Sequence, residues 1–334
     1  MPAGIATPDA EGDPLSQALS LIGARTAVAG AFTASGSWAL RLQPRARLKL
    51  TAVVHGSCWL DTEGLQAPLL LEEGEVAVLV DRPWDVLASD PAAAPVDAGP
   101  LFTDRPDRLL RLGEEPATTT VIGSHVEMDR SGEQLLLAVL QPVTRIRAGS
   151  PHAPVVRLLL DRLHHEVRDR RPGATAAARH YAYLLFVEVL RTQLADPLAF
   201  PPGWLRVLAT RELAPAVALM HESPATNWHL EDLARATALS RSTFAERFRA
   251  AAGMPPLAYL RNWRMRLAEQ ALRETDTTVA VLAASLGYSS ESAFTHAFIR
   301  STGTSPSRYR ASSRQARSAT AQDAPTDQIA PPLT

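Results

Sequence analysis

Residues 279–310 carry the clearest pattern of apolar and polar positions in the chain. Apolar side chains recur at the spacing of one helical face, at Val279, Leu282, Ala283 and Leu286. Gly287 ends this helix, and Ser290 is placed to cap a second helix in which Phe294 and Phe298 point to the same side. Two short helices joined by a glycine-containing turn form a helix-turn-helix, whose second helix lies in the major groove of DNA. The pattern predicts this motif here.

The same pattern occurs a second time, about 49 to 50 positions earlier, in residues 229–261. The first helices correspond through Leu230, Leu233 and Ala234, which match Val279, Leu282 and Ala283. The later parts correspond through Phe244, Phe248, Gly253, Pro256 and Tyr259, which match Phe294, Phe298, Gly303, Pro306 and Tyr309. Each copy therefore ends in Gly-x-x-Pro-x-x-Tyr. The sequence predicts a tandem of two helix-turn-helix motifs.

A longer helix, predicted at 257–273, connects the two copies. Its apolar positions are expected to be buried, at Leu260, Trp263, Leu267 and Ala271. Its basic positions are expected to be exposed, at Arg261, Arg264 and Arg266. A continuous helix would hold the two motifs at a fixed separation.

The N-terminal half shows a different period. Between residues 28 and 80, short apolar and alternating runs are separated by Gly, Pro and Asp, which is typical of β-strands. Strands are predicted at 48–54, 57–60, 75–80 and 121–128. Turn residues at intervals of roughly 8 to 12 positions indicate a small β-barrel or sandwich.

Helical spacing returns between residues 153 and 194. One helix is predicted to run to about residue 170, where Arg-Pro-Gly breaks it, and a second one covers 178–194. The second helix is expected to bury Tyr181, Leu184, Leu185 and Val189. Such a pair forms an antiparallel hairpin, which either covers the barrel or joins two copies of the chain. A further helix is predicted at 205–221.

The composition of the connecting segments sets the predicted domain boundaries. They are a disordered N-terminus at 1–12, a β-rich domain at 13–150, the helical hairpin at 151–195, a proline-rich linker at 196–203, the tandem motif domain at 204–311 and a disordered tail at 312–334. The chain is therefore predicted to be a multidomain α+β protein.

The tandem resembles the DNA-binding domain of the AraC/XylS family of bacterial transcriptional regulators. The resemblance rests on VxxLAxxxGYSSxSxFxxAF, on the GTSPSRYR segment and on the connecting helix LAYLRNWRMRLAEQAL. The β-rich half is similar to the cupin-like sensor domain of one branch of that family, through GSWALRL, VVHGSCWL, LEEGEVAVL and LLLAVLQPV. The resemblance implies a cupin-like β-barrel with a helical hairpin, followed by an all-α tandem helix-turn-helix domain.

The same resemblance implies the function and the partners. We expect a sequence-specific DNA-binding transcription regulator, an activator rather than a repressor, whose N-terminal domain senses a small-molecule or redox effector. Double-stranded promoter or operator DNA is the expected partner, with RNA polymerase as a further one. The hairpin is expected to form a homodimer.

Composition and charge narrow these expectations. Hydrophobic residues make up 46% of the 334 residues and charged ones 21%, which is ordinary for a globular protein. Neither a membrane-spanning run nor a signal peptide is recognised, and a single cysteine permits no internal disulfide, so a cytoplasmic location is expected. Residues 204–317 hold 15 arginines and 9 acidic residues, a net charge of +6, whereas the remainder has 19 basic and 26 acidic residues, a net charge of −7. The basic half is the one with the tandem motifs, which favours a polyanionic partner.

The candidate DNA-contacting residues lie opposite the phenylalanines on the two recognition helices. On the first helix they are Arg241, Ser242, Ala245, Glu246 and Arg249, and on the second Glu291, Ser292, Thr295, His296 and Arg300. The family resemblance assigns base reading to Ser242, Ala245 and Glu246 and to Glu291, Ser292 and His296. Arg249 and Arg300 lie further along and are expected to bind phosphate, which positions the protein without specifying sequence.

The sensor half offers only weak candidates for chemistry, namely His55, Cys58 and Trp84. Where the family pattern has a proline followed by a histidine, this chain has Pro83 and Trp84, which leaves His55 and His125 as the available imidazole ligands. No metal and no cofactor are therefore expected. Cys58 is either a small buried hydrophobic residue or a redox sensor, which requires exposure and a low pKa.

Three other classes compete with a regulator. A cupin-type metal-dependent enzyme fused to a DNA-binding domain is the main alternative, although the metal ligands are lacking. A DNA-repair protein that accepts alkyl groups requires a zinc-bound cysteine cluster, which one cysteine cannot supply. A non-specific architectural binder fits poorly with a basic domain joined to an acidic one.

Overall fold

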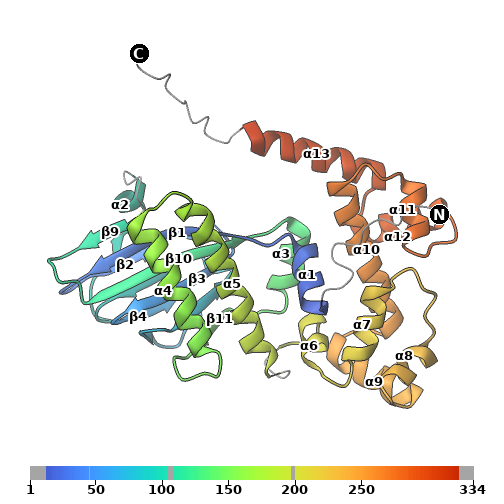
Figure 1. Ribbon diagram of the computed structural model, residues 1–334, viewed down its shortest axis with the longest axis horizontal. Coiled ribbons are helices and arrows are strands. Elements are labelled where there is room, and N and C mark those ends of the chain that lie inside the picture. Colours follow the sequence, from blue (N-terminus) through green and yellow to red (C-terminus); the bar gives the residue numbers. More distant parts are fainter. Residues whose placement is uncertain (1–12, 45, 104–108, 197–199, 323–334) are drawn as a thin grey trace. The chain divides into compact units, whose positions relative to one another are not determined.

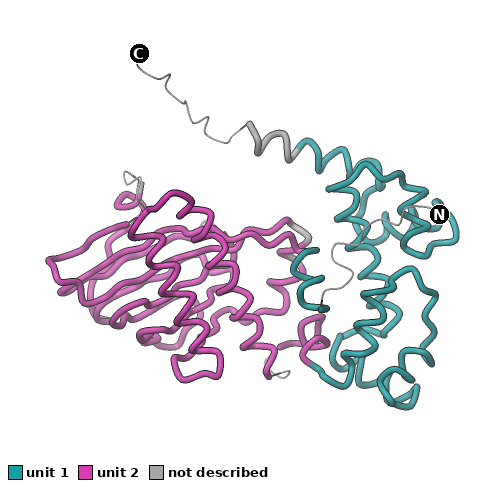
Figure 2. Tube along the Cα trace, in the orientation of Figure 1, with its two compact units in different colours: residues 1–21, 210–334 teal, residues 22–209 magenta. Residues whose placement is uncertain are grey.

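The computed structural model describes residues 13–44, 46–103, 109–196 and 200–322. It contains two compact units, one formed by residues 22–209 and the other by the residues up to Leu21 together with those from Thr210 onward (Figure 2). The first unit contains all of the β-strands and the second contains the helix-turn-helix motifs. The division at 209/210 falls six residues after the predicted linker, of which 197–199 lie outside the described residues.

The first unit is built on two facing β-sheets. The six-stranded sheet has the order β11-β6-β3-β10-β1-β9, with β1 Arg25–Ala34, β3 Leu48–His55, β6 Val76–Val80, β9 Leu109–Leu112, β10 Thr119–Glu127 and β11 Val143–Ile146. The five-stranded sheet has the order β5-β4-β7-β2-β8, with β2 Ala39–Leu42, β4 Ser57–Thr62, β5 Leu69–Glu72, β7 Asp85–Ala88 and β8 Val96–Asp97. The four predicted strands correspond to β3, β4, β6 and β10. A cupin-like β-barrel was the expectation for this unit, and it is confirmed.

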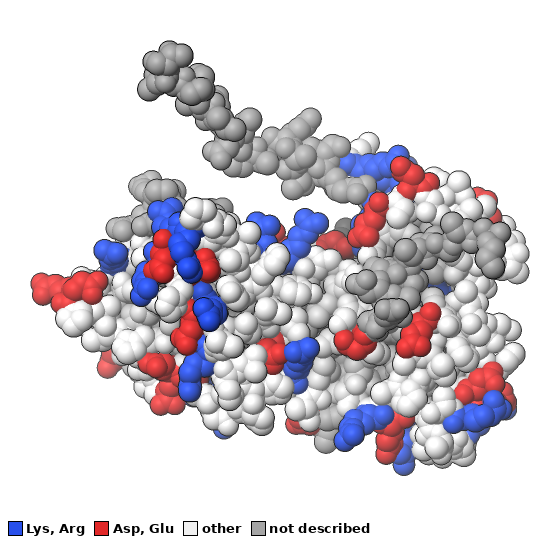
Figure 3. Space-filling view, in the orientation of Figure 1, with Lys and Arg blue, Asp and Glu red and all other residues white. Residues whose placement is uncertain are grey.

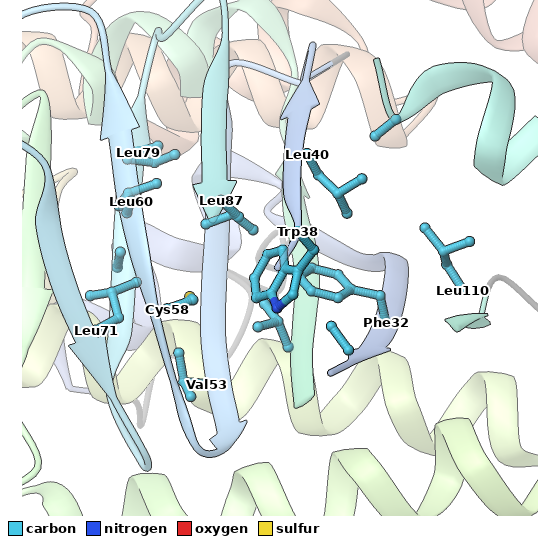
Figure 4. Close-up of a cluster of buried hydrophobic side chains, with 14 residues drawn as sticks. Phe32, Trp38, Leu40, Val53, Cys58, Leu60, Leu71, Leu79, Leu87 and Leu110 are labelled. Atoms are coloured by element: carbon cyan, nitrogen blue, oxygen red, sulfur yellow. The ribbon is translucent and has the colours of Figure 1, made fainter. Parts of the chain in front are cut away.

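Successive side chains along a strand point to opposite faces of the sheet, and both faces of the six-stranded sheet are buried. Val53 of β3 packs in a cluster with Phe32, Leu60 and Leu79, which draws its members from both sheets (Figure 4). Val54, the next residue, packs on the opposite face in a cluster that includes Leu163 of the hairpin. Both faces of β3 are therefore buried. A buried ion pair joins the two sheets, since Lys49 Nζ of β3 lies 2.6 Å from Asp85 Oδ2 of β7.

The hairpin consists of α4 Ala153–Asp169 and α5 Ala174–Leu194, which cover the outer face of the six-stranded sheet (Figure 1). Arg170, with a φ of 51°, ends α4, and α5 begins four residues earlier than predicted because the Ala-rich segment after Gly173 continues the helix. Leu184 was expected to be buried but is 48% exposed. The reason is that α4 and the sheet bury only the side of α5 that carries Leu185 and Val189.

Three further short helices precede the hairpin in the sequence, and the first of them belongs, up to Leu21, to the second unit. They are α1 Pro14–Ile22, α2 Gly99–Thr103 and α3 Arg130–Leu137. The helix α1 is amphipathic, and it buries Leu19 and Ile22. No helix in the described part of the chain is both long and apolar enough to cross a membrane.

The second unit follows the predicted order of helices, with two differences. Its elements are α7 Ala214–Glu222, α8 Leu230–Ala236, α9 Arg241–Ala252, α10 Pro256–Glu274, α11 Val279–Ser285, α12 Glu291–Thr302 and α13 Pro306–Gln322. The single helix predicted at 205–221 is instead α6 Trp204–Ala209 and α7, because the chain turns at 210–213 and restarts with a proline in the first turn of α7.

The predicted disordered tail is the second difference. Residues 312–322 continue the helix α13, although their sequence has no apolar periodicity. The segment contains Ala, Arg and Gln and has no Gly or Pro before Pro325, so its intrinsic helix propensity suffices to extend a helix that has already begun. Residues 323–334, like the predicted disordered N-terminus at 1–12, lie outside the described residues.

Candidate nucleic-acid interface

The two helix-turn-helix motifs are built on the same aromatic frame. Phe244 and Phe248 of α9 are fully buried, with ring centroids 5.6 Å apart, and Phe294 and Phe298 of α12 are fully buried at 5.8 Å. The tyrosine of each Gly-x-x-Pro-x-x-Tyr ending then packs its edge against the second phenylalanine. The centroid distances are 5.4 Å for Phe248 and Tyr259 and 5.5 Å for Phe298 and Tyr309. The repeat predicted from sequence spacing is confirmed, and it fixes which side of α9 and α12 faces outward.

Both recognition helices also begin in the same way. Ser240 Oγ accepts a hydrogen bond from the Thr243 backbone N–H at 3.2 Å, and Ser290 Oγ accepts one from Ala293 N–H at 3.1 Å. Each serine has an extended backbone, as an N-cap requires. These caps define the first turn of α9 and α12, which is the part of a recognition helix that meets base edges.

The outward face of α9 carries the residues expected there. Arg241, Ser242, Glu246 and Arg249 are exposed, and Ala245 is half-buried. Arg241 Nη1 forms an ion pair with Glu231 Oε1 of α8 at 2.9 Å, so one of its donors is already engaged. Among the described residues Arg249 has no ion-pair partner, and its guanidinium is available to a phosphate.

The outward face of α12 differs in composition. Glu291, Ser292, His296 and Arg300 are exposed, and Thr295 is half-buried. The exposed stripe at spacing i, i+3, i+4 and i+7 from Ser292 also includes Ile299, which is 41% exposed. Ile299 is not among the residues predicted from the sequence to contact DNA. The repeat could have identified Ile299, because an offset of 50 residues aligns it with the candidate Arg249. The same offset aligns Arg300 with Ala250.

The connecting helix α10 buries Leu260 and Trp263 as predicted and exposes Arg261. Arg264 was expected to be exposed, and this is wrong. Its Nε donates to the Pro224 carbonyl oxygen at 2.6 Å and its Nη2 to the Thr226 carbonyl oxygen at 3.0 Å. Arg266 is likewise half-buried and lies 3.3 Å from Glu269. Of the three arginines predicted to be exposed only Arg261 is, because helical periodicity cannot show that a loop folds back over Arg264 or that Arg266 lies against Glu269.

A histidine supports the first motif from within the core. The His221 ring stacks on Trp263 at a centroid distance of 3.6 Å, and its Nε2 lies 2.9 Å from the Tyr259 hydroxyl. Burial lowers the pKa of His221 to about 3 and raises the pKa of Tyr259 above its ordinary value. Both groups are therefore neutral at neutral pH.

The three candidates in the sensor domain do not converge on one site. His55, exposed at the end of β3, has its Nδ1 3.0 Å from Glu73 Oε2. Trp84 lies beside the other end of β4, where Thr62 Oγ1 donates to its carbonyl oxygen and the Arg41 guanidinium lies 4.7 Å from its ring centroid. His55 and His125 lie at opposite ends of the β3–β10 pair. The described residues contain no group of three or more His, Cys, Asp or Glu side chains suited to hold a metal ion.

Cys58 is 1% exposed and belongs to the core cluster between the two sheets (Figure 4). Burial raises the pKa of its thiol to about 12. Oxidants react with the thiolate, which is not populated at neutral pH when the pKa is this high. The geometry therefore favours the interpretation of Cys58 as a small core residue over that of a redox sensor.

Charge on the molecular surface is mixed on the face that Figure 3 shows, where basic and acidic side chains alternate over both units. The positive net charge of the C-terminal half does not form one continuous basic patch there.

Both halves of the chain match known protein families. Residues 13–195 match the cupin family, and residues 233–312 match a helix-turn-helix domain family. A protein of Streptomyces lividans described as an AraC-like transcription regulator is 38% identical over 298 residues, which are 89% of this chain and 98% of that protein. A Streptomyces antibioticus protein with the same description is 37% identical over the same shares.

Among solved structures, the DNA-binding domain of the global transcriptional factor AdpA in complex with a target DNA is 36% identical. The match covers 32% of this chain and 96% of that domain, with a TM-score of 0.31. The two Streptomyces relatives are matched over 98% of their own length, and both are described as AraC-like transcription regulators. The chain belongs to the AraC family of transcription regulators.

Proposed function

We propose that this regulator reads an operator half-site as two short boxes, one contacted by α9 and the other by α12. The observation that supports this most directly is the repeated aromatic frame, which exposes equivalent faces of two capped helices connected by the single helix α10. Two such helices can enter successive major grooves on one side of the duplex, about 34 Å apart.

The roles of individual residues follow from their positions. We assign base contacts to Ser242, Ala245 and Glu246 in the first box and to Glu291, Ser292 and His296 in the second, with Arg241 and Thr295 at the margins. A glutamate accepts a hydrogen bond from the amino group of cytosine, and alanine contacts the methyl group of thymine. Arg249 and Arg300 bind phosphate and set the register.

The regulator is proposed to act as an activator that contacts RNA polymerase, in response to an effector sensed by the cupin-like unit. It is proposed to act as a homodimer through the hairpin. Three of the large apolar side chains that remain exposed lie on the hairpin, namely Val155, Leu158 and Leu184. Exposed apolar side chains on both helices of one hairpin support an interaction surface there. His55 and Trp84 are the proposed effector contacts, at the two ends of the barrel.

The test is to select bound fragments from genomic DNA with the purified chain, and then to measure affinities for the selected sequence and for single-base variants. His296→Ala is expected to relax base preference within one box, because it removes a base contact worth about 1–3 kcal/mol of discrimination. Arg300→Ala is expected to weaken binding to all sequences equally and to reduce its salt dependence. The same uniform loss for both variants would contradict the assigned roles, and no selected sequence at all would contradict the proposed function.

A further inference from the structure

Three segments meet at one point of the C-terminal unit. They are the loop 223–229 that precedes α8 in the first motif, the turn at Gly287 and Tyr288 in the second motif, and Arg264 of α10. We call the point where they meet the inter-motif junction. Arg264 donates to the Pro224 and Thr226 carbonyl oxygens of the loop at 2.6 Å and 3.0 Å. Its guanidinium carbon also lies 5.9 Å from the Tyr288 ring centroid, within the range of a cation–π contact. One side chain of the connecting helix therefore touches both motifs.

The loop and the turn also contact each other directly. Gly287 has a φ of 76°, and a Cβ atom placed on it would lie 2.2 Å from the Ala225 carbonyl oxygen. Only glycine allows the two backbones to approach this closely. The corresponding residue of the first motif is Ala238, which is exposed. The second motif thus requires glycine at position 287 for two reasons, the left-handed backbone of the turn and the close contact with the loop of the first motif.

Internal hydrogen bonds stiffen the loop. Thr226 N–H donates to the Ser223 carbonyl oxygen at 3.1 Å, and Trp228 N–H donates to the Thr226 carbonyl oxygen at 2.9 Å. Trp228 Nε1 adds a bond to the Ser223 carbonyl oxygen at 3.0 Å, and Pro224 is buried. Because these hydrogen bonds hold the loop in one conformation, its contact with the turn fixes the position of one motif relative to the other.

The junction connects the two motifs through side-chain and backbone contacts, in addition to the covalent chain. Along the backbone, residues 253–255, the helix α10 and residues 275–278 link α9 to α11. Rotation in either short segment would change the direction of α12 relative to α9. The junction closes a second path between the motifs. Burial lowers the pKa of Arg264 below its ordinary value. Two of its donors are already bonded to backbone carbonyls, so its role here is within the protein.

We propose that the inter-motif junction fixes the spacing and relative orientation of α9 and α12, so that Arg264 is a positioning residue through which the regulator discriminates between operators by the distance between their two boxes. The proposal rests on the bipartite reading proposed above. The distance between the two boxes then contributes to specificity. Inserted base pairs rotate one box relative to the other around the DNA axis, and two motifs in a fixed orientation cannot follow that rotation.

The experiment compares duplexes that contain the two selected boxes at the selected spacing with duplexes in which two base pairs are inserted between them. The wild-type chain is expected to bind the lengthened duplex at least about tenfold more weakly, because only one box can then be engaged. Arg264→Ala is expected to lose affinity for the selected spacing and to bind both duplexes within about threefold of each other. Gly287→Ala, which displaces the loop from the opposite side, is expected to show the same loss of discrimination.

Arg261→Ala is the matched control, because Arg261 is exposed on the same helix and has no ion-pair partner among the described residues. It removes the same charge and is expected to keep the spacing preference of the wild type. If the wild-type chain binds specifically but has no spacing preference, the bipartite reading itself fails. If the wild type prefers one spacing and Arg264→Ala keeps that preference, the junction proposal alone is overturned.

A distance measurement in the free protein separates positioning from loss of folding. Spin labels on Ala250→Cys and Ser301→Cys, in a Cys58→Ser background, report the separation of α9 and α12 through electron–electron dipolar coupling. The wild-type side chains are expected to give a single narrow distance distribution, and Arg264→Ala a broader one at unchanged helix content by circular dichroism. An equally narrow distribution in the variant would overturn the proposal.

Discussion

The two helix-turn-helix motifs share a frame but differ in how each tyrosine is held. In the first motif, Tyr259 bonds to His221, a neutral imidazole stacked on Trp263, and both residues are buried. In the second motif, Tyr309 accepts a hydrogen bond from Arg273 at 2.9 Å and lies 3.4 Å from Glu269, so its partners are charged. The same position in the repeat therefore has a neutral hydrogen-bond partner in one copy and charged partners in the other.

The turns differ in a related way. Ala238 has a φ of 54° in the first motif, whereas Gly287 has a φ of 76° in the second. An alanine in the left-handed region is strained, but the exposed turn of the first motif has room for its side chain. The turn of the second motif is pressed against the loop of the first. The two copies are unequal because each occupies a different place in one joined structure.

Gly287→Ala is expected to have the largest effect. The clash with the Ala225 carbonyl and the left-handed backbone together cost about 3 kcal/mol of unfolding free energy. Hydrogen exchange of α11 and α12 measures this loss. Gly303→Ala is the matched control, because Gly303 has a φ of 75° but nothing within 4 Å of the added Cβ. It should cost only about 1 kcal/mol, and an equal cost for both variants would show that contact with the loop is unimportant.

Acid is expected to destabilise the first motif more than the second through His221. The pKa of His221 is about 3 in the folded chain and 6.5 when unperturbed. Below about pH 6.5 the unfolded chain binds a proton that the folded chain excludes, so stability falls with decreasing pH down to about pH 3. At about pH 5 the loss is about 2 kcal/mol relative to pH 7.5.

The measurement is urea unfolding at these two pH values, followed by circular dichroism, for the wild type and for His221→Phe. The phenylalanine keeps a ring in contact with Trp263 but has no titratable group. The variant should therefore show a smaller difference between the two pH values. An unchanged difference would mean that other groups cause the acid sensitivity.

Arg264 and Arg314 correspond in the repeat, 50 positions apart, and each bonds to the segment that precedes the first helix of its motif. Arg264→Ala is expected to cost about 1–2 kcal/mol, because it leaves two carbonyl groups without a charged donor. Arg314→Ala should cost less than about 1 kcal/mol, since its partner Asp276 is on the surface. Thermal unfolding of both variants tests the order, and the reverse order would contradict the unequal roles of the two arginines.

Ala238→Gly is expected to have the smallest effect. Glycine relieves the left-handed strain at Ala238 but adds entropy to the unfolded chain, and the net gain in stability is at most about 1 kcal/mol. A urea midpoint that decreases would show that the alanine side chain makes a stabilising contact in the first turn.

The sequence predicted the elements of the DNA-binding half well. Spacing of Phe244, Phe248, Phe294 and Phe298 located both recognition helices and their outward faces, because local periodicity and N-caps determine short helices. The repeat turned one ordinary motif into a tandem. The positions of Ile299 and of Arg264 were missed, since the first required comparison of the two copies in register and the second depends on a loop that folds back from distant sequence.

The sensor half was less predictable in detail. Alternation identified β3, β4, β6 and β10, but the pairing order of the two sheets arises from contacts between distant segments. The exposure of Leu184, the burial of Cys58 and the separation of His55 from Trp84 depend on which faces meet.

The sequence by itself determined the family, the tandem motifs, the helix caps and the candidate reading residues, because these depend on patterns within about one repeat of the chain. Only the tertiary structure decided that Arg264 bonds to a loop, that Gly287 is required by a neighbouring backbone and that His221 is kept neutral. Each of these depends on burial and on close approach between segments distant in the chain, for which local sequence carries no signal.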